Sequence, residues 1–146
     1  MLNALIQPAK NWLRGPYRKA RPGYVKWRHG FGRAELLAAL EQAGIRRGDA
    51  VLVRSSMGGF EGFDGTVPDI VTAFEGAVGP EGTLMMPTLS TGGSAVEFAE
   101  SGRIFDPRTT PSQMGLLSEV FRRSPGVARS IHPTHSVAAW GADTGW

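Results

Sequence analysis

From about residue 33 onward, the spacing of apolar side chains predicts an alternation of helices and strands. Residues 33–44, RAELLAALEQAG, have leucines on one helical face and end in Gly44, a typical helix terminus. The leucines of this face are Leu36, Leu37 and Leu40. Residues 48–56, GDAVLVRSS, form a short apolar run with valines, which predicts a buried strand. The regular part of the chain therefore starts with a helix followed by a strand.

The next segments repeat this alternation around a glycine-rich loop, residues 57–65. A second helix is predicted over residues 66–79, because Thr66 and Asp69 have the spacing of a capping box at its start. Its core face consists of Ile70, Phe74 and Val78. Residues 82–90, GTLMMPTLS, predict a second buried strand. Strand, helix and strand in this order form a βαβ unit, so we expect the first strands of the sheet to be parallel.

The second half of the chain starts with residues 91–109, which lack a clean period and predict a long, functional loop. A third helix is predicted over residues 110–126, with Thr110 as its cap and Pro111 in the first helical position. Its inward residues are Leu117, Val120 and Phe121. HSVAAWG, residues 135–141, predicts a third strand. The predicted fold class is α/β, a layered α/β/α-like domain with a sheet that starts parallel.

Composition is that of an ordinary globular domain. The 146 residues are 41% apolar and 20% charged, and no apolar run approaches the roughly 18 residues that span a membrane. The chain has no cysteine, which excludes disulfides, thiolate metal sites and a cysteine nucleophile. Its first residues lack the long apolar core and cleavage site of a signal peptide, so we expect a cytoplasmic protein.

The charge divides the chain into a basic extension, residues 1–32, and a domain, residues 33–146. Up to residue 33 there are eight basic side chains and no acid, so the formal charge of +3 leaves the remainder at about −5. Such a segment can make weak contact with an anionic membrane surface, or it can pack on the domain or on a second subunit of a homo-oligomer. Packing is the favoured interpretation, and no nucleic-acid partner is expected.

The loop SSMGGFEGFDG is the first candidate for chemistry. It follows a strand and opens a helix, where glycines allow close backbone approach and free amides favour anions. Ser55 and Ser56 stand at the carboxyl end of the strand, where open α/β sheets bind ligands. The loop matches neither the Walker pattern nor GxGxxG, so a tight strand-to-helix connection explains it equally well.

The segment SIHPTHS, residues 130–136, holds two of the three histidines and is the second candidate. A metal pair would need a third ligand, and no HExxH or cysteine pattern supplies one, so no metal is expected. A Ser–His–Asp hydrolase would need a GxSxG elbow, which is absent. The residues leave two interpretations open: a histidine general base oriented by a carboxylate, or a structural histidine at a strand start.

Several blocks together resemble the aminoglycoside 3-N-acetyltransferases, the antibiotic N-acetyltransferase family. They are SS after the first strand, GPEGTLMMPT, FDPRTTPSQMG and RSIHPTHSVAAWG, in the family's order and over about residues 33–146. The resemblance implies acetyl-CoA as donor and a small amine, a ring amine of an aminoglycoside, as acceptor. Because the chain has no cysteine, we expect direct attack in a ternary complex.

The resemblance also implies site residues. His132, directly before the proline, corresponds to the histidine regarded as the general base, and His135 would line the site beside it. The residues expected near coenzyme A are Ser55, Ser56, Met57, Gly58, Thr88 and Thr110. Some members have an acid two residues after the histidine, and this chain has Thr134 there.

Family members continue well beyond the last predicted strand, so the resemblance covers their amino-terminal part only. We therefore expect an incomplete sheet with poorly covered apolar side chains around that strand, namely Phe121, Val137, Ala139 and Trp140. The alternative function is a truncated, catalytically inactive fragment that acts at most as a coenzyme A-binding or interaction module.

Overall fold

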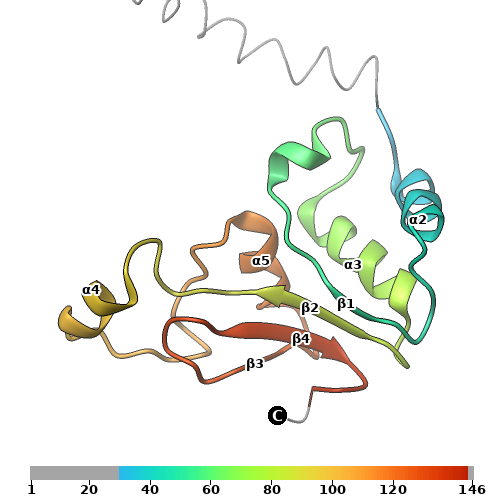
Figure 1. Cartoon of the computed structure of the whole chain (residues 1–146). Helices are drawn as coiled ribbons and strands as arrows, with labels where there is room; N and C mark the ends of the chain where they lie inside the picture. Colours follow the sequence, from blue (N-terminus) through green and yellow to red (C-terminus); the bar gives the residue numbers. More distant parts are fainter. Residues whose placement is uncertain (1–29, 145–146) are drawn as a thin grey trace, which may run out of the picture.

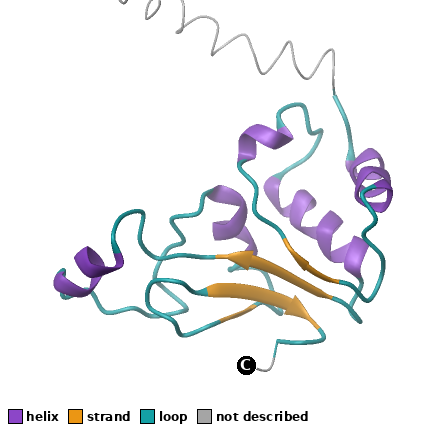
Figure 2. Cartoon of the chain, viewed as in Figure 1, coloured by secondary structure: helices purple, strands orange, loops and turns teal. Residues whose placement is uncertain are grey.

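The computed structural model of the chain describes residues 30–144 and has a four-stranded mixed sheet at its base (Figure 1; Figure 2). The strands are β1 (Ala50–Leu52), β2 (Thr83–Pro87), β3 (Ala128–Arg129) and β4 (Val137–Gly141), in the spatial order β1-β2-β4-β3. β1 and β2 are parallel, whereas β4 runs antiparallel to both β2 and β3. The α/β class and the parallel start of the sheet are confirmed.

The helices are α2 (Arg33–Gln42), the 3₁₀ helix η1 (Met57–Phe60), α3 (Val67–Val78), α4 (Ala95–Glu100) and α5 (Leu116–Phe121). Figure 1 shows α2, α3 and α5 on the same side of the sheet, and α4 beyond the carboxyl end of β2. None of the helices in this part of the chain has the length and apolarity needed to cross a bilayer.

The core lies between α3, α5 and the sheet. The predicted face of α3 is confirmed, since Ile70, Phe74 and Val78 are at most 6% exposed. Leu84 of β2 and Phe121 of α5 are fully buried in the same cluster. Each such side chain contributes roughly 1.5–3 kcal/mol by leaving water, so packing of α3 is the main local source of stability.

The start of α3 confirms the predicted capping box. The backbone N–H of Thr66 donates to Asp69 Oδ2 at 2.7 Å, and the Thr66 hydroxyl donates to the same oxygen at 2.6 Å. The hydroxyl bond and then the backbone bond hold the pKa of Asp69 below its ordinary value. The capping box therefore fixes Thr66 as the start of α3, directly after the glycine-rich loop, residues 57–65.

The third helix starts five residues later than predicted. It begins at Leu116, and its cap is Gly115 with φ of 109°, a conformation that glycine adopts readily. Thr110 is no helix cap: its Oγ1 accepts from the N–H of Asp106 at 2.9 Å. The N–H of Gln113 donates to Leu89 O at 2.7 Å, a tertiary bond that keeps this segment out of the helix.

The long loop predicted over residues 91–109 contains a helix, α4. Ser94 caps it by accepting from the Val96 N–H at 3.1 Å, and the Glu97 carboxylate accepts from the Ser94 N–H at 3.3 Å. This S-x-x-E signal is present in the sequence, but the helix has six residues and buries only Phe98, so no apolar period marks it. The two-residue strand β3 was also not predicted.

Two expectations about burial are wrong. The first strand is an edge strand, and Leu52 is 59% exposed rather than buried. Phe121 and Ala139, expected to be poorly covered, have no exposed surface. Ala139 is flanked by Met85 of β2 and Ala128 of β3, which explains its burial.

The basic extension falls largely outside the described residues. Its last part already pairs with the domain, since the Phe31 N–H donates to Gly62 O at 3.1 Å and Phe31 O accepts from the Asp64 N–H at 2.8 Å. The Phe31 and Phe63 rings meet edge to face at 5.5 Å. The regular contacts of the domain therefore begin before α2.

Candidate functional site

Three loops meet at the edge of the sheet where strands β1 and β2 end: the loop after β1, the loop after β2 and the segment before β4. The carboxyl ends of the parallel strands β1 and β2 lie there, which is where open α/β sheets bind ligands. Because β4 is antiparallel and Val137 pairs with Pro87, the segment that precedes β4 returns to the same edge. The Thr88 N–H donates to Ser136 O at 2.8 Å and joins the two segments.

The centre of this edge is the guanidinium of Arg129. Its Nε donates to Thr88 Oγ1 at 3.1 Å and to Ser136 Oγ at 3.0 Å, and its Nη2 donates to Thr88 O at 2.6 Å. Its Nη1 donates to Pro107 O at 3.3 Å and to Thr110 O. One side chain thus connects the end of β2, the segment before β4 and the loop that leads to α5.

Within the described part of the chain, neutral oxygens and an aromatic ring surround the Arg129 guanidinium. Its guanidinium carbon lies 5.0 Å from the centre of the Phe105 ring, a cation–π arrangement. Burial lowers the pKa of Arg129, and the nearby charge of Arg122 lowers it further. Such a cation depends on every acceptor around it, because a charge removed from water without compensation is costly.

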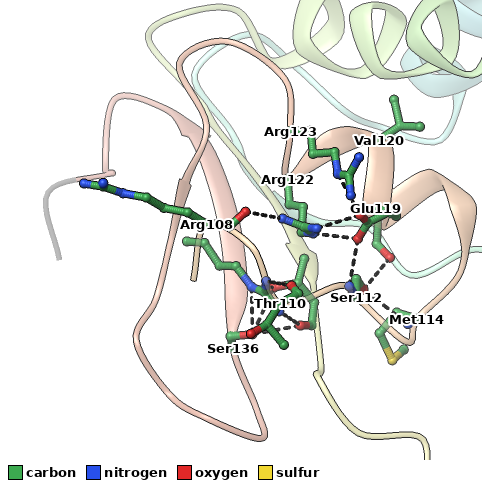
Figure 3. A network of polar contacts seen from close by, with 12 residues as sticks. Arg108, Thr110, Ser112, Met114, Glu119, Val120, Arg122, Arg123 and Ser136 are labelled. Carbon is green, nitrogen blue, oxygen red and sulfur yellow. Dashed lines mark hydrogen bonds and ion pairs between the residues drawn. The ribbon is translucent and has the colours of Figure 1, made fainter. Parts of the chain in front are cut away.

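A second polar cluster lies beside the first, as Figure 3 shows. Arg122, only 2% exposed, donates from Nε and Nη2 to the two carboxylate oxygens of Glu119, each at 2.6 Å. Glu119 also accepts from the Ser112 N–H at 2.7 Å and pairs with Arg123 at 2.7 Å. The Nη1 of Arg122 donates to Arg108 O at 3.0 Å.

These contacts set the ionisation of Glu119. Burial acts to raise its pKa, but the Arg122 hydrogen bond, the Ser112 N–H and the charges of Arg122 and Arg123 outweigh it. The net result is a pKa below the ordinary value, so Glu119 is ionised at neutral pH.

Together, the two arginines fix the loop that leads into α5 through its carbonyl groups. Sequence reasoning missed Arg122, Glu119 and Arg129. Glu119 and Arg122 have the i, i+3 spacing of a helical ion pair, and Arg129 opens the block RSIHPTHS, so the residue types were visible. Their common target, the loop before α5, is up to 22 residues away in sequence and could not be predicted from these residue types.

The structure separates the residues expected near coenzyme A into two groups. Thr88 has no exposed surface, and its hydroxyl contacts Ser136 Oγ at 3.2 Å as well as Arg129. Thr110 is half-buried and lines a groove with Ser90 and Gln113, while its carbonyl accepts from Arg129. In this arrangement Thr88 is an internal residue, and a direct contact with a cofactor stays unsupported.

The second group follows β1 and is open to solvent. Ser55 and Ser56 are exposed, and the Ser55 hydroxyl donates to Ser56 O at 3.3 Å. A small cleft is lined by Val53, Arg54, Ser55, Met86, Pro87, Met114, Leu117 and Ser118. Gly58 is also exposed, whereas Met57 is half-buried against the core. This loop can therefore offer hydroxyls and backbone groups to a ligand.

The two histidines form a compact turn with Thr134. Nδ1 of His132 accepts from the N–H groups of Thr134 at 3.3 Å and His135 at 3.0 Å. The two rings meet edge to face at 5.5 Å, and the Thr134 hydroxyl lies 2.8 Å from His135 Nδ1. A hydroxyl bond from Ser90 to Pro133 O ties this turn to the loop after β2. Both rings are exposed, so their Nε2 atoms are the nitrogens left for a ligand.

The ring nitrogens of this turn contact backbone N–H groups and a hydroxyl rather than a carboxylate. Thr134, at the position where an acid was considered, is only 8% exposed and bonds to His135. Among residues 30–144, no three histidine, aspartate or glutamate side chains converge as metal ligands. The turn is therefore held together by its own backbone, and any carboxylate that orients a histidine base has to come from outside these contacts.

Comparison with known structures defines the class of this domain. The chain superposes on the apoenzyme of aminoglycoside acetyltransferase AAC(3)-IVa with a TM-score of 0.69 and 33% identity, over 80% of this chain and 43% of that one. It superposes on AAC-IIIb, solved as a binary complex with CoASH, with a TM-score of 0.68 and 28% identity, over 80% and 48%. The fold is that of an aminoglycoside acetyltransferase.

The sequence relatives agree. Aminoglycoside N(3)-acetyltransferase IV from Salmonella is 34% identical over 116 residues, which is 78% of this chain and 40% of that protein. The aminoglycoside N(3')-acetyltransferase-like protein YokD of Bacillus subtilis is 32% identical, over 70% of this chain and 43% of its own length. The family model described as aminoglycoside 3-N-acetyltransferase matches residues 52–146. The chain belongs to the aminoglycoside 3-N-acetyltransferase family, and it spans about 40% of the length of these curated relatives.

Proposed function

We propose that this chain serves the transfer of an acetyl group from acetyl-CoA to an amino group of an aminoglycoside-like acceptor, in the cytoplasm. The observation that carries the proposal is the family match over residues 52–146, which includes all three loops at the carboxyl edge of β1 and β2. Related structures in complex with CoASH and with a gentamicin support both substrate classes.

The reaction requires the acceptor nitrogen to attack the thioester carbonyl. A carbon–nitrogen bond forms, the carbon–sulfur bond breaks, coenzyme A leaves with the sulfur, and the amine gives up a proton to a base. Since the chain lacks cysteine, the acetyl group passes directly from one substrate to the other. The exposed loop with Ser55 and Ser56 contacts coenzyme A in this proposal, and the exposure of both hydroxyl-bearing side chains supports that role.

The base is assigned to the histidine turn, with His132 as the group that takes the proton and His135 lining the site. The geometry adds a condition to this assignment. Because Nδ1 of His132 accepts two backbone N–H groups, the neutral ring carries its proton on Nε2, the nitrogen that an amine could reach. His132 can act as the base only if this turn rearranges; otherwise His135 takes that role.

A chimera tests the proposal. Residues 30–144 would replace the matching part of the Salmonella N(3)-acetyltransferase IV, which is 34% identical to this chain. We expect acetylation of gentamicin, measured by coenzyme A release, and a loss of at least about a hundredfold in His132→Ala. The matched variant His135→Ala is expected to lose much less. A larger loss in His135→Ala would move the base to His135, and an inactive chimera that still folds and binds coenzyme A would contradict the proposed function.

A second candidate function is coenzyme A binding without turnover by the 146-residue chain alone. The observation that favours it is the histidine turn, whose ring nitrogens contact backbone N–H groups and a hydroxyl instead of an orienting carboxylate. Groups that act as a unit fail as a unit, so we expect no acetyl transfer by this chain alone. An increase in melting temperature with acetyl-CoA, without product, is the expected result; turnover would contradict it.

A further inference from the structure

Ser90 connects the loop after β2 with the histidine turn. Its side chain is only 5% exposed, and its hydroxyl donates to the carbonyl oxygen of Pro133 in that turn. In the part of the chain that the structure describes, this is the single hydrogen bond that joins residues 131–135 to a segment outside residues 130–137. The polar attachment of the turn to the rest of the domain therefore depends on Ser90.

The backbone that carries this donor is itself held on two sides. The N–H of Thr88 donates to Ser136 O at 2.8 Å, and the carbonyl of Leu89 accepts from the N–H of Gln113 at 2.7 Å. The two residues before Ser90 are thus bonded to the segment before β4 and to the loop before α5. Groups supported by such a second set of hydrogen bonds hold their partners more precisely than groups on a free loop.

The internal bonds of the turn link the Pro133 carbonyl to both histidine rings. Nδ1 of His132 accepts from the N–H groups of Thr134 and His135, on the far side of the proline. The two rings also contact each other edge to face, with their centres 5.5 Å apart. A displacement of the Pro133 carbonyl would therefore move both rings together.

We propose that Ser90 is a positioning residue for acetyl transfer: it holds the histidine turn in place while one of the two rings takes the proton of the amine. This inference rests on the proposed function. A misplacement of about 1 Å can cost about a hundredfold in rate, so a loosened turn lowers turnover even in a folded protein. Ser90 also lines a groove with Phe98, Arg103 and Gln113, so the test has to separate positioning from direct contact with the acceptor.

The first test measures kcat and KM for gentamicin in the chimera with residues 30–144. In Ser90→Ala we expect kcat to fall at least about tenfold and KM to stay within about twofold, because the hydroxyl acts on the turn and not on the acceptor. The matched control is Ser124→Ala, which removes another partly buried hydroxyl, one that donates to Val120 O at 3.1 Å. It should leave both constants within about twofold. Ser90→Thr keeps a hydroxyl and should recover most of kcat.

The second test uses the 146-residue chain without any substrate. Relaxation of the backbone ¹⁵N nuclei gives order parameters for residues 132, 134 and 135. We expect values near 0.85, typical of rigid backbone, in the unaltered chain and in Ser124→Ala, and values below about 0.6 in Ser90→Ala. Unchanged order parameters in Ser90→Ala would overturn the inference, whatever the activity of the chimera.

The remaining outcomes separate this inference from the proposed function. If the unaltered chimera acetylates gentamicin and Ser90→Ala has the same kcat, the proposed function stands and the role of Ser90 is overturned. A raised KM with an unchanged kcat would overturn it as well, because Ser90 would then contact the acceptor. Equal loss of kcat in Ser90→Ala and Ser90→Thr would exclude the hydroxyl as the cause. An unaltered chimera that folds and binds coenzyme A without turnover would contradict the proposed function, and this inference with it.

Discussion

The loop after β1 and the loop before α5 lie at the same edge of the sheet and are built in opposite ways. In the first, Ser55 and Ser56 are exposed and share one weak internal hydrogen bond. In the second, the carbonyls of residues 107, 108 and 110 all accept from Arg122 or Arg129. The hydroxyl groups of the first loop therefore remain available to a ligand. The carbonyl groups of the second loop are occupied by hydrogen bonds that hold its conformation.

This difference indicates that the sequence blocks shared with the family serve different purposes: some maintain the structure, and others leave polar groups available to a ligand. Arg129 connects the blocks FDPRTTPSQMG and RSIHPTHS through its hydrogen bonds to Thr110 and Ser136. Part of the sequence that these blocks share with the family therefore maintains the structure. The serines after β1 make one internal hydrogen bond, and their role in coenzyme A binding is a prediction. The comparison predicts that substitutions in the two regions will separate stability from binding.

The largest effect is expected for Arg129→Met. The change removes the donor of five hydrogen bonds to oxygens of Thr88, Pro107, Thr110 and Ser136. At about 0.5–1.5 kcal/mol for each bond, we expect a loss of about 3–5 kcal/mol in the free energy of unfolding. Urea denaturation measures it. Arg123→Met, at a side chain that is 65% exposed, is the control and should cost less than about 1 kcal/mol. Similar costs for both would remove the distinction between the regions.

The next effect depends on pH. Glu119 has a lowered pKa in the folded protein, so its contribution is present above its unfolded pKa and is lost as the pH falls through the folded value. We expect Glu119→Gln to cost about 2–3 kcal/mol at pH 7, because Arg122 loses its buried partner. The cost relative to wild type should shrink below about pH 4.5. A cost independent of pH would mean that the carboxylate charge is unimportant.

An intermediate effect is expected in the histidine turn. His132→Ala removes the acceptor of two backbone N–H groups and should cost about 1 kcal/mol. His135→Ala removes one contact with Thr134 and should cost less. Thermal unfolding of both variants measures the difference. If His135→Ala were the more destabilising change, the turn would depend on the Thr134 contact rather than on His132.

The smallest effect on stability belongs to the open loop. The double variant Ser55→Ala, Ser56→Ala should change the free energy of unfolding by less than about 0.5 kcal/mol, since both side chains are exposed. It should nevertheless reduce the rise in melting temperature that coenzyme A causes in the unaltered chain. An unchanged ligand response would separate these serines from cofactor binding.

Sequence patterns predicted the elements whose signals are local. The Thr66–Asp69 box and the apolar face of α3 fix that helix from its own residues. The start of α5 was predicted wrongly, because Thr110 and Pro111 resemble a helix start while tertiary bonds hold the segment elsewhere. The role of Arg129 depends on carbonyl groups from distant segments, and backbone carbonyls leave no mark in the sequence.

The pairing of β2 with β4 also bears on the order of folding. Thr88 and Ser136 are bonded although they are 48 residues apart, whereas the parallel pairing of β1 with β2 joins residues 33 apart, such as Ala50 and Thr83. Closing so long a loop costs chain entropy before its contacts form. We therefore expect the contacts of Arg129 to form after the folding barrier is crossed. Substitutions there would then act by speeding unfolding, so that this arginine governs the lifetime of the native state more than the rate at which it is reached.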